Sequence, residues 1–237
     1  MNDSKTEFLA AGCAYYLHFL PQLELTIGTY NITPSQVIRN LGVFLNKTMS
    51  FSNHVNHLRQ TINFQIKNLW RIRSFIEINT CHHVVRALVT SRLDYCNALF
   101  TYLSSADICR LQRLQNSAAR VIFAVGRRAE ATPLLINLHW LTVSKRITFK
   151  LLLYVFKFFQ NQNPLYLSDC FQKYVPARQL RSSSDSTRLV IPKPSNTVFG
   201  EKRFHIAAAK AWNELPNEIR SASTIENFKR KLKSYMF

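Results

Sequence analysis

Residues 91–100, SRLDYCNALF, bring four side chains that could do chemistry into one short stretch. Arg92, Asp94, Tyr95 and Cys96 offer a cation, a carboxylate, a phenol and a thiol nucleophile, which together could form a catalytic cluster. The same stretch could instead be a helix whose polar groups serve packing. The element that carries the stretch therefore decides whether the sequence predicts an enzyme.

Apolar residues at helical spacing predict a helix over about residues 80–102. Its apolar stripe consists of Val85, Leu88, Cys96 and Leu99. Arg92 lies within this stripe, whereas Asp94 points to another side of the helix, so the two do not meet on their own element. A buried arginine needs an acceptor from elsewhere in the fold. We expect Arg92 and Asp94 to be structural polar anchors rather than catalytic groups.

The rest of the chain offers little further catalytic chemistry. Its five aspartates are isolated in the sequence: Asp3, Asp94, Asp107, Asp169 and Asp185. A two-metal nucleotidyl-transfer site needs several carboxylates that converge on ions about 4 Å apart. No GxSxG, HExxH or P-loop motif occurs. We expect that the chain is not an enzyme, has no catalytic residues and needs no cofactor.

The cysteines and the apolar runs bear on location. The five cysteines include no CxxC pair, which indicates reduced thiols in an intracellular protein of the nucleus or cytoplasm. Cys81, His82 and His83 are adjacent, with no second pair at zinc-finger spacing, so we expect no metal site. The longest apolar run, residues 151–156, is far too short to span a membrane. We expect no secretory signal at the first residues, which lack a cationic region.

Charge gives the strongest functional signal. The chain has 237 residues with a formal net charge of +18, and its hydrophobic share of 47% is typical of a globular protein. Residues 41–200 hold 21 Lys and Arg against six acidic residues. Such an excess suits a polyanionic partner, with nucleic acid first and an anionic membrane surface second. A solvated positive surface without a partner remains the alternative.

An arginine stripe lies on a helix expected from Ser104 to Gly126. Ser104 followed by Asp107 resembles a capping box, and Gly126 suits the residue after a helix. One face of this helix is apolar, and four arginines fall on another face that carries no acid: Arg110, Arg113, Arg120 and Arg127. Guanidinium groups suit phosphate oxygens, so the stripe predicts nucleic-acid contact, with a solvated face as the alternative.

Two further basic groups are visible. The first lies late in a long amphipathic helix expected over residues 52–77 and consists of Lys67, Arg71 and Arg73. Trp70 beside it could belong to a nucleic-acid groove or to the core. The second lies on the last helix, which we expect to begin at Ser223, and consists of Lys229, Arg230, Lys231 and Lys233. Cations there also complement the helix dipole, which weakens the case for a binding role.

The elements that must position these residues indicate a mainly α-helical (α+β) protein with a small N-terminal β element and a helical bundle-like core. Residues 6–45 resemble short strands, and Gly42 within that pattern suggests a bulge or a close backbone approach. Residues 144–159 are apolar nearly all round, which is typical of a central buried helix. Residues 175–199 are rich in proline and serine and predict an irregular segment with a short strand at 188–191.

Several runs together resemble the C-terminal part of reverse transcriptases from non-LTR retrotransposons of the LINE class. They occur in order as LGVFLNKTMSFSNHVNHL, VTSRLDYCNALF, LQRLQNSAARVIF, LHWLTVSKRITFKLLLYVFK, PLYLSDC, RLVIPKP and AAAKAWNELPNEIRSASTIENFKRKLKSYMF. The resemblance covers essentially the whole chain. The opening NDSKTEFL is similar to the stretch that follows the polymerase active site in that family.

The resemblance implies a division into four parts. Residues 1–50 would be the end of a palm-like β region with a primer-grip-like hairpin at 38–45, 51–174 a thumb-like and downstream helical domain, 175–200 a linker and 201–237 a C-terminal helical pair. Arg39, Gly42 and Lys47 would then contact nucleic acid. The family's upstream aspartate and aromatic-x-Asp-Asp turn are absent and would lie before residue 1.

We therefore expect RNA or DNA as the partner, held through phosphate contacts as the parent polymerase would hold an RNA–DNA duplex, with no small-molecule substrate. Two alternatives remain open. The chain could be a decayed retroelement remnant without a selected function, or a cationic helical module that docks on acidic proteins or membranes.

Overall fold

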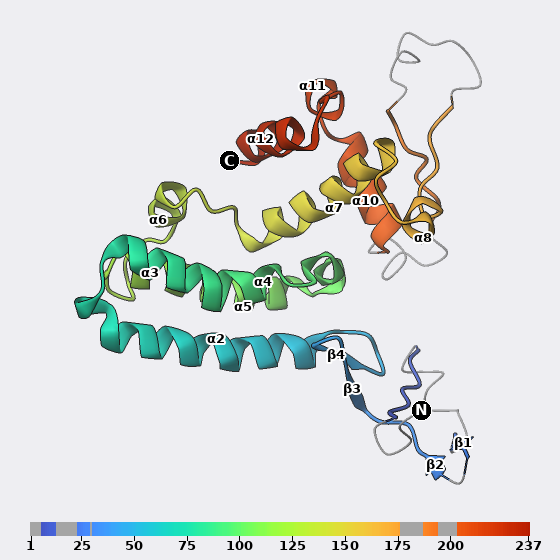
Figure 1. Cartoon of the computed structure of the whole chain (residues 1–237), viewed down its shortest axis with the longest axis horizontal. Helices are drawn as coiled ribbons and strands as arrows, with labels where there is room; N and C mark the ends of the chain where they lie inside the picture. The colour runs from blue at the N-terminus through green and yellow to red at the C-terminus, as the bar shows by residue number, and fades with distance from the viewer. Residues whose placement is uncertain (1–5, 13–22, 29, 176–186, 194–202) are drawn as a thin grey trace.

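The computed structural model describes residues 6–12, 23–28, 30–175, 187–193 and 203–237, and it confirms a mainly helical protein with a small β element near the N-terminus (Figure 1). Two antiparallel hairpins come first, β1 (Leu25–Ile27) with β2 (Tyr30–Ile32) and β3 (Val37–Asn40) with β4 (Val43–Asn46). The helical elements then follow in this order: α2 (Ser52–Ile72), η2 (Arg73–Phe75), α3 (Ile78–Val85), η3 (Arg86–Thr90), α4 (Ser91–Asp94), η4 (Asn97–Tyr102), α5 (Ser105–Ile122), α6 (Thr132–Asn137), α7 (Val143–Phe159), α8 (Leu165–Ser168), α10 (Phe204–Asn213), α11 (Asn217–Arg220) and α12 (Ile225–Met236).

The β3–β4 hairpin turns through Leu41 and Gly42. Both residues have positive φ angles, 46° and 84°, as a two-residue type I′ turn requires. Gly42 therefore sits in the turn, and the expected bulge within a strand is wrong. A Cβ added at Gly42 would lie 3.8 Å from Cε1 of Tyr95, an ordinary contact, so the φ angle rather than crowding explains the glycine.

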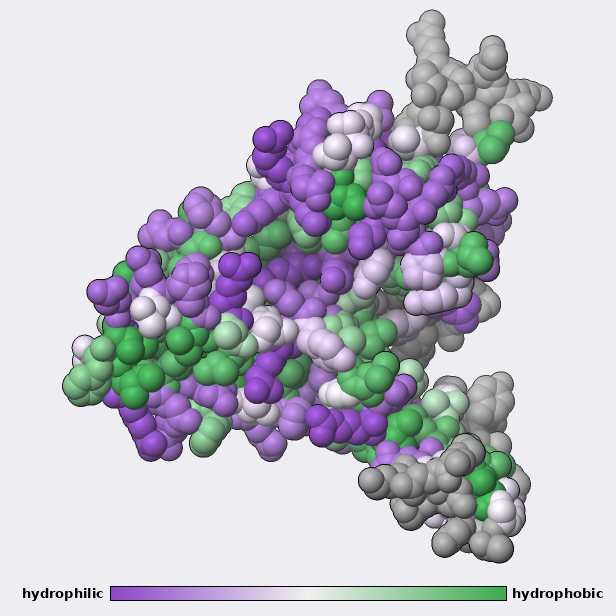
Figure 2. Space-filling view, in the orientation of Figure 1, coloured by the Kyte–Doolittle hydropathy of each residue, from purple (hydrophilic) through white to green (hydrophobic). Residues whose placement is uncertain are grey.

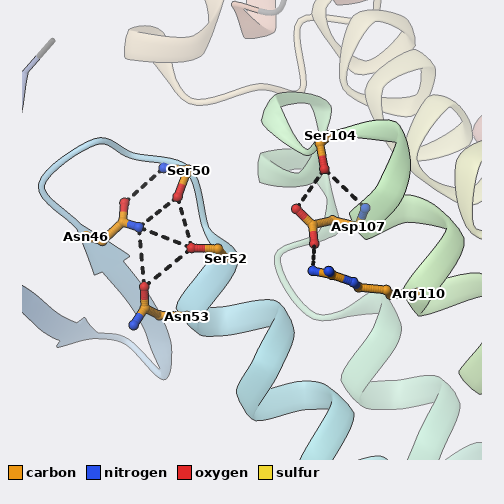
Figure 3. Close-up of polar contacts among 7 residues, drawn as sticks. All are labelled: Asn46, Ser50, Ser52, Asn53, Ser104, Asp107 and Arg110. Carbon is orange, nitrogen blue, oxygen red and sulfur yellow. Dashed lines mark hydrogen bonds and ion pairs between the residues drawn. The ribbon is translucent and has the colours of Figure 1, made fainter. Parts of the chain in front are cut away.

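A network of hydrogen bonds among polar side chains joins this hairpin to α2 (Figure 3). The Asn46 Oδ1 accepts from the Ser50 amide at 2.9 Å, and its Nδ2 donates to the Ser50 hydroxyl at 2.7 Å. Met49 and Phe51, on either side of Ser50, both have positive φ, and Phe51 is buried. This hydrogen-bond network thus stabilises the bent loop between β4 and α2, which places Phe51 in the core.

Helix α2 carries the predicted apolar stripe into the core but is shorter than expected. Val55, Ile62 and Leu69 are among its buried residues. The helix ends at Ile72 and is followed by the short turn η2, not by helix to residue 77. The side chain of Arg73 in this turn donates to carbonyls at the end of α5, which brings the ends of the two helices together.

The helix expected over residues 80–102 is broken. A π-helical turn, η3, separates α3 from α4, and Cys96 adopts a left-handed conformation with φ of 52° before η4. The wide turn rotates the phase of the helix, so that Val85 of the predicted apolar stripe is buried and the later stripe residues are not. The buried apolar positions are Cys81, Val85, Val89 and Leu93. Leu88 is only partly buried, and Cys96 and Leu99 are exposed.

Helix α5 begins as the sequence predicts and ends early. Ser104 is its N-cap, and the Asp107 amide donates to the Ser104 hydroxyl at 3.1 Å. The helix ends at Ile122, because Ala124 takes a left-handed conformation with φ of 53°. Arg127 therefore lies beyond the helix, and the expected continuation to Gly126 is wrong.

Helix α7 is the central element and takes part in two hydrophobic clusters. Val143 and Ile147 join a cluster built by α2, α3 and α5, whereas Leu152 and Phe156 join a second cluster with α10 and α12. Figure 1 shows α7 between the α3–α5 layer and α12. Helices α10 and α12 therefore share a hydrophobic core with α7.

Two details of the C-terminal part differ from the sequence-based expectation. Thr224, not Ser223, caps α12 by accepting from the Asn227 amide at 3.2 Å. The strand expected at 188–191 is reduced to an isolated antiparallel bridge between Lys173 and Leu189. Most of the irregular segment, residues 176–186 and 194–202, lies outside the described residues.

Candidate nucleic-acid interface

The stretch 91–100 serves packing between elements. Arg92 is half-buried, and its Nε donates to the Leu88 carbonyl one helical turn earlier, at 3.0 Å. Within the described part of the chain its acceptor is thus local in sequence, and the expected acceptor from elsewhere in the fold is not found. Asp94 makes the cross-element contact instead, through an ion pair of 2.7 Å with Arg146 of α7. Cys96 is exposed.

Arg146 makes this ion pair part of a fixed junction between α4 and α7. Its Nε donates to the Leu141 carbonyl at 2.9 Å, and its guanidinium lies over the ring of Trp140, 5.8 Å from the ring centroid. The Arg146 side chain is 16% exposed and that of Asp94 42%. Charge-assisted hydrogen bonds of this geometry orient both side chains, which favours a positioning role for Asp94.

The arginine stripe of α5 is partly neutralised within the chain. Asp107 lies one turn before Arg110 and pairs with it at 2.8 Å, so the face is not free of acids as expected. The Nε of Arg120 donates to the Ala129 carbonyl at 2.9 Å. Arg113 and Arg127 are exposed, but Arg127 is not on the helix. The four arginines therefore do not form one continuous cationic stripe.

The basic group at the end of α2 divides into an exposed pair and a structural residue. The Nε and Nη2 of Arg73 donate to the carbonyl of Ile122, at 3.2 and 2.7 Å, and its Nη1 donates to that of Ile76 at 2.8 Å. All three nitrogens of its guanidinium group are therefore occupied, and Arg73 closes the end of α5. Lys67 and Arg71 are exposed, and neither has a side-chain partner among the residues that the structure describes.

We define the outer face of α2 as Phe64, Lys67, Trp70 and Arg71. Lys67 lies three residues after Phe64, and Trp70 and Arg71 lie three and four residues after Lys67, so all four share one side of the helix. Phe64 is 61% exposed and Trp70 38%, which places Trp70 at the surface and resolves its ambiguous assignment. Gln60 and Asn63, also exposed, add amide groups to the same side.

A long run without acidic residues is a signal for this face that lies outside the basic motifs. Residues 25–76 contain no aspartate or glutamate, so β1–β4 and α2 carry only positive and neutral side chains. Arg39 and Lys47 of the β3–β4 region are both exposed within this acid-free run. Arg39 lies over the ring of Phe44, 5.7 Å from its centroid. Residues 25–76 themselves therefore add only positive charge to the electrostatic potential of this part of the surface.

A buried histidine near the start of α2 has no such surface role. His54 is 3% exposed, packs against Phe44 and Phe100, and neither ring nitrogen has a hydrogen-bond partner in the described part of the chain. Burial, with a smaller contribution from the nearby His57, lowers the pKa of His54 from 6.5. The folded protein therefore holds His54 in its neutral form.

Replacing His54 with leucine is expected to stabilise the protein and reduce its sensitivity to acid. At neutral pH, removal of two unpaired nitrogens should add about 1 kcal/mol to the free energy of unfolding. Because the folded pKa is lowered, the unfolded chain binds more protons as pH falls below 6.5, and the parent protein loses stability there. Urea unfolding at pH 7 and pH 5 measures both effects. An equal loss of stability in parent and variant would contradict the assignment.

Among the described residues, no group of three or more His, Cys, Asp or Glu side chains is placed to hold a metal ion. Within the same residues, no helix is long and apolar enough to cross a bilayer.

Comparison with known proteins found no match to a family model, a curated protein or a solved structure. The resemblance to non-LTR reverse transcriptases therefore stays a prediction from the sequence motifs. The exposed cations and aromatic rings of the outer face of α2 are the structural features that indicate a function.

Proposed function

We propose that this chain binds nucleic acid through phosphate contacts and acts without catalysis, as the part of a non-LTR retrotransposon reverse transcriptase that follows the polymerase active site. The outer face of α2 carries the proposal. It presents two unpaired cations, Lys67 and Arg71, with two exposed aromatic rings, in a run of sequence free of acids.

This combination suits nucleic acid better than a purely acidic protein. Cations neutralise phosphates and release condensed counterions, which supplies most of the affinity. Aromatic rings stack on unpaired bases, and exposed amides such as Asn63 form hydrogen bonds with phosphate and sugar oxygens. An acidic protein surface would use the cations but offers no bases to the aromatic rings.

The β3–β4 hairpin extends the proposed surface. Arg39 and Lys47 are exposed, and hydrogen bonds from Asn46 to Ser50 and Ser52 hold the hairpin to the start of α2. On this proposal, the hairpin and α2 both contact the same nucleic acid, and the hydrogen bonds between them fix their relative position. Arg113 of α5 and Arg127 beyond its end are exposed too, but they lie on other elements and are not part of the proposed surface.

Competition binding tests the proposal. Fluorescence anisotropy would follow a labelled RNA–DNA duplex and a labelled single strand, with polyglutamate and anionic vesicles as competitors, over a range of salt concentrations. We expect affinity for nucleic acid to fall steeply with salt, by about 0.7–0.9 in log K per log salt for each phosphate contact. Equal or tighter binding to polyglutamate or to vesicles would replace nucleic acid with the corresponding partner.

A further inference from the structure

A polar pocket lies between α3–α4 and α7, with α12 at its rim. Its volume is about 440 Å³, and its lining residues come from α3, η3, α4, η4, α7, α12 and the loop before α7. Figure 2 shows hydrophilic residues gathered in a hollow at the centre of the displayed face, between the α3–α4 row and α12. None of the residues of the outer face of α2 lines this pocket.

Positive charge dominates the pocket lining. Four cations contribute to it: Arg86, Arg146, Lys150 and Lys233. Asp94 is the acid among the lining residues, and it is paired with Arg146. Four positive charges against one negative charge leave an excess of three, before any contribution from histidine. The side chains of Arg86 and Lys233 make no hydrogen bond or ion pair with described residues, so they are available to an anion.

Asn97 supplies a second, independent feature of the same pocket. It is 4% exposed, it belongs to the lining, and its Oδ1 accepts no hydrogen bond from the described residues. Burying an amide oxygen without a donor costs free energy, and such unsatisfied groups are rare in folded proteins. The oxygen itself is closed to solvent in this structure, so a ligand with a hydrogen-bond donor would satisfy it after the Asn97 side chain turns toward the pocket.

Part of the remaining lining is apolar, beside His82, Thr90 and His139. Leu138, Phe149 and Leu153 provide a wall that has no charge. Trp140 also belongs to the lining, but its ring already contacts Arg146 and His82. A flat apolar group would therefore pack against the leucines and Phe149. The pocket thus combines an anion subsite, a buried acceptor and an apolar wall.

We propose that this pocket binds one nucleotide unit. The phosphate would lie among Arg86, Lys150 and Lys233, and a hydroxyl or amino group of the sugar or base would donate to Oδ1 of Asn97. Inorganic phosphate alone would leave the buried acceptor unsatisfied. The volume is within the range of small-molecule sites. The proposal does not depend on the outer face of α2, since the two sites share no residue.

Calorimetry on the full chain with AMP, inorganic phosphate and adenosine tests the composition of the site. We expect AMP to bind at least about tenfold more tightly than inorganic phosphate or adenosine. Inorganic phosphate would contact only the cations, and adenosine only Asn97 and the apolar wall. Equal affinities of AMP and inorganic phosphate would overturn the nucleotide assignment. Since mononucleotides are too small to span the outer face of α2, this result is distinct from any result with a long duplex.

Two lysines on α12 provide a matched pair of variants. Lys233 lines the pocket, whereas Lys229, one turn away on the same helix, does not, and both are exposed. We expect Lys233→Gln to weaken AMP binding by about tenfold, since a hydrogen bond to a charged group is lost, and Lys229→Gln to leave it unchanged. Equal effects of the two substitutions on AMP affinity would contradict binding of the nucleotide in this pocket.

Asn97→Leu tests the buried acceptor. Leucine has a similar size and no hydrogen-bonding group, so AMP affinity should approach that of inorganic phosphate, whose affinity should not change. An Asn97→Leu protein that keeps its preference for AMP would contradict the role of Asn97. If this variant does not fold, the comparison of Lys233→Gln with Lys229→Gln still decides the proposal.

The nucleotide could be free or the end of a strand, and oligonucleotides distinguish these sources. A short strand with a 5′-phosphate would be compared with the same strand carrying a 5′-hydroxyl, in the Lys67→Gln/Arg71→Gln background, which removes the cations of the outer face of α2. Tighter binding of the phosphorylated strand than of AMP supports a strand end. Tighter binding of AMP supports a free nucleotide. If neither the phosphate of AMP nor the 5′-phosphate of the strand increases affinity, the proposal is overturned.

Discussion

Replacing both Lys67 and Arg71 with glutamine is expected to flatten the salt dependence of nucleic-acid binding. Each phosphate contact contributes about 0.7–0.9 to the slope of log K against log salt, so the double variant should lose about 1.5. The loss should be the same for unrelated sequences, because phosphate contacts carry no base information. Anisotropy titrations of a labelled duplex at several salt concentrations measure the slope.

The matched control removes the same charge from another part of the surface. Arg113→Gln/Arg127→Gln also deletes two exposed cations, but Arg113 and Arg127 lie outside the acid-free run of residues 25–76. We expect this double variant to keep most of the slope. Glutamine is a good helix former, so circular dichroism should show both variants folded. A large loss of slope in the control, with none in the α2 variant, would return the interface to the stripe predicted from the sequence.

Replacing Phe228 with alanine is expected to cost about 3–5 kcal/mol of the free energy of unfolding, the usual range for a buried phenylalanine. Phe228 is fully buried on α12, and its ring stacks on that of Phe156 of α7 with centroids 4.2 Å apart. The Trp212 ring of α10 lies 5.9 Å away, so one residue joins three helices. Urea unfolding followed by circular dichroism measures the cost.

The exposed Phe64 is the control for this substitution. It is 61% exposed on α2, so Phe64→Ala should change the unfolding free energy by less than about 0.5 kcal/mol. The same variant should weaken binding to single strands, because a stacking surface is lost. A Phe228→Ala protein as stable as the parent would mean that the C-terminal helices fold apart from α7.

Local signals predicted much of the fold. The apolar stripe of α2 and the Ser104 cap of α5 are as expected, because spacing and capping act within a few residues. The apolar character of residues 144–159 likewise predicted the central position of α7. Errors of one residue, such as the cap at Thr224 in place of Ser223, arise because two neighbouring hydroxyl groups can both cap a helix.

The break in the second helix could not be predicted from spacing. The hydroxyl of Tyr95 donates to the Leu41 carbonyl at 2.6 Å, a contact between residues 54 positions apart. This hydrogen bond connects the hairpin turn to the end of α4, just before Cys96 adopts its left-handed backbone conformation. A periodic pattern within one helix contains no information about a partner so distant in the chain.

The candidate site divides in the same way. The sequence identified Lys67, Arg71 and Arg113 as basic residues near apolar stripes, and all three are exposed. It could not show that the cations of Arg73 and Arg110 are used inside the chain, since their partners are set by how α2 meets α5 and by the Asp107 rotamer. Arg92 and Asp94 were both expected as anchors, and the structure gives the contact between helices to Asp94 alone.

By itself, the sequence determined the helical class, the positive charge and the acid-free run of residues 25–76, because composition and periodicity are properties of the chain alone. Only the tertiary structure decided which cations remain free, because an arginine is neutralised or occupied by groups that arrive from other elements. It also brought Arg86, Lys150 and Lys233 around Asn97, four residues of four separate elements. Their sequence separation is large, and packing of α7 between the two hydrophobic clusters is the physical reason that they meet.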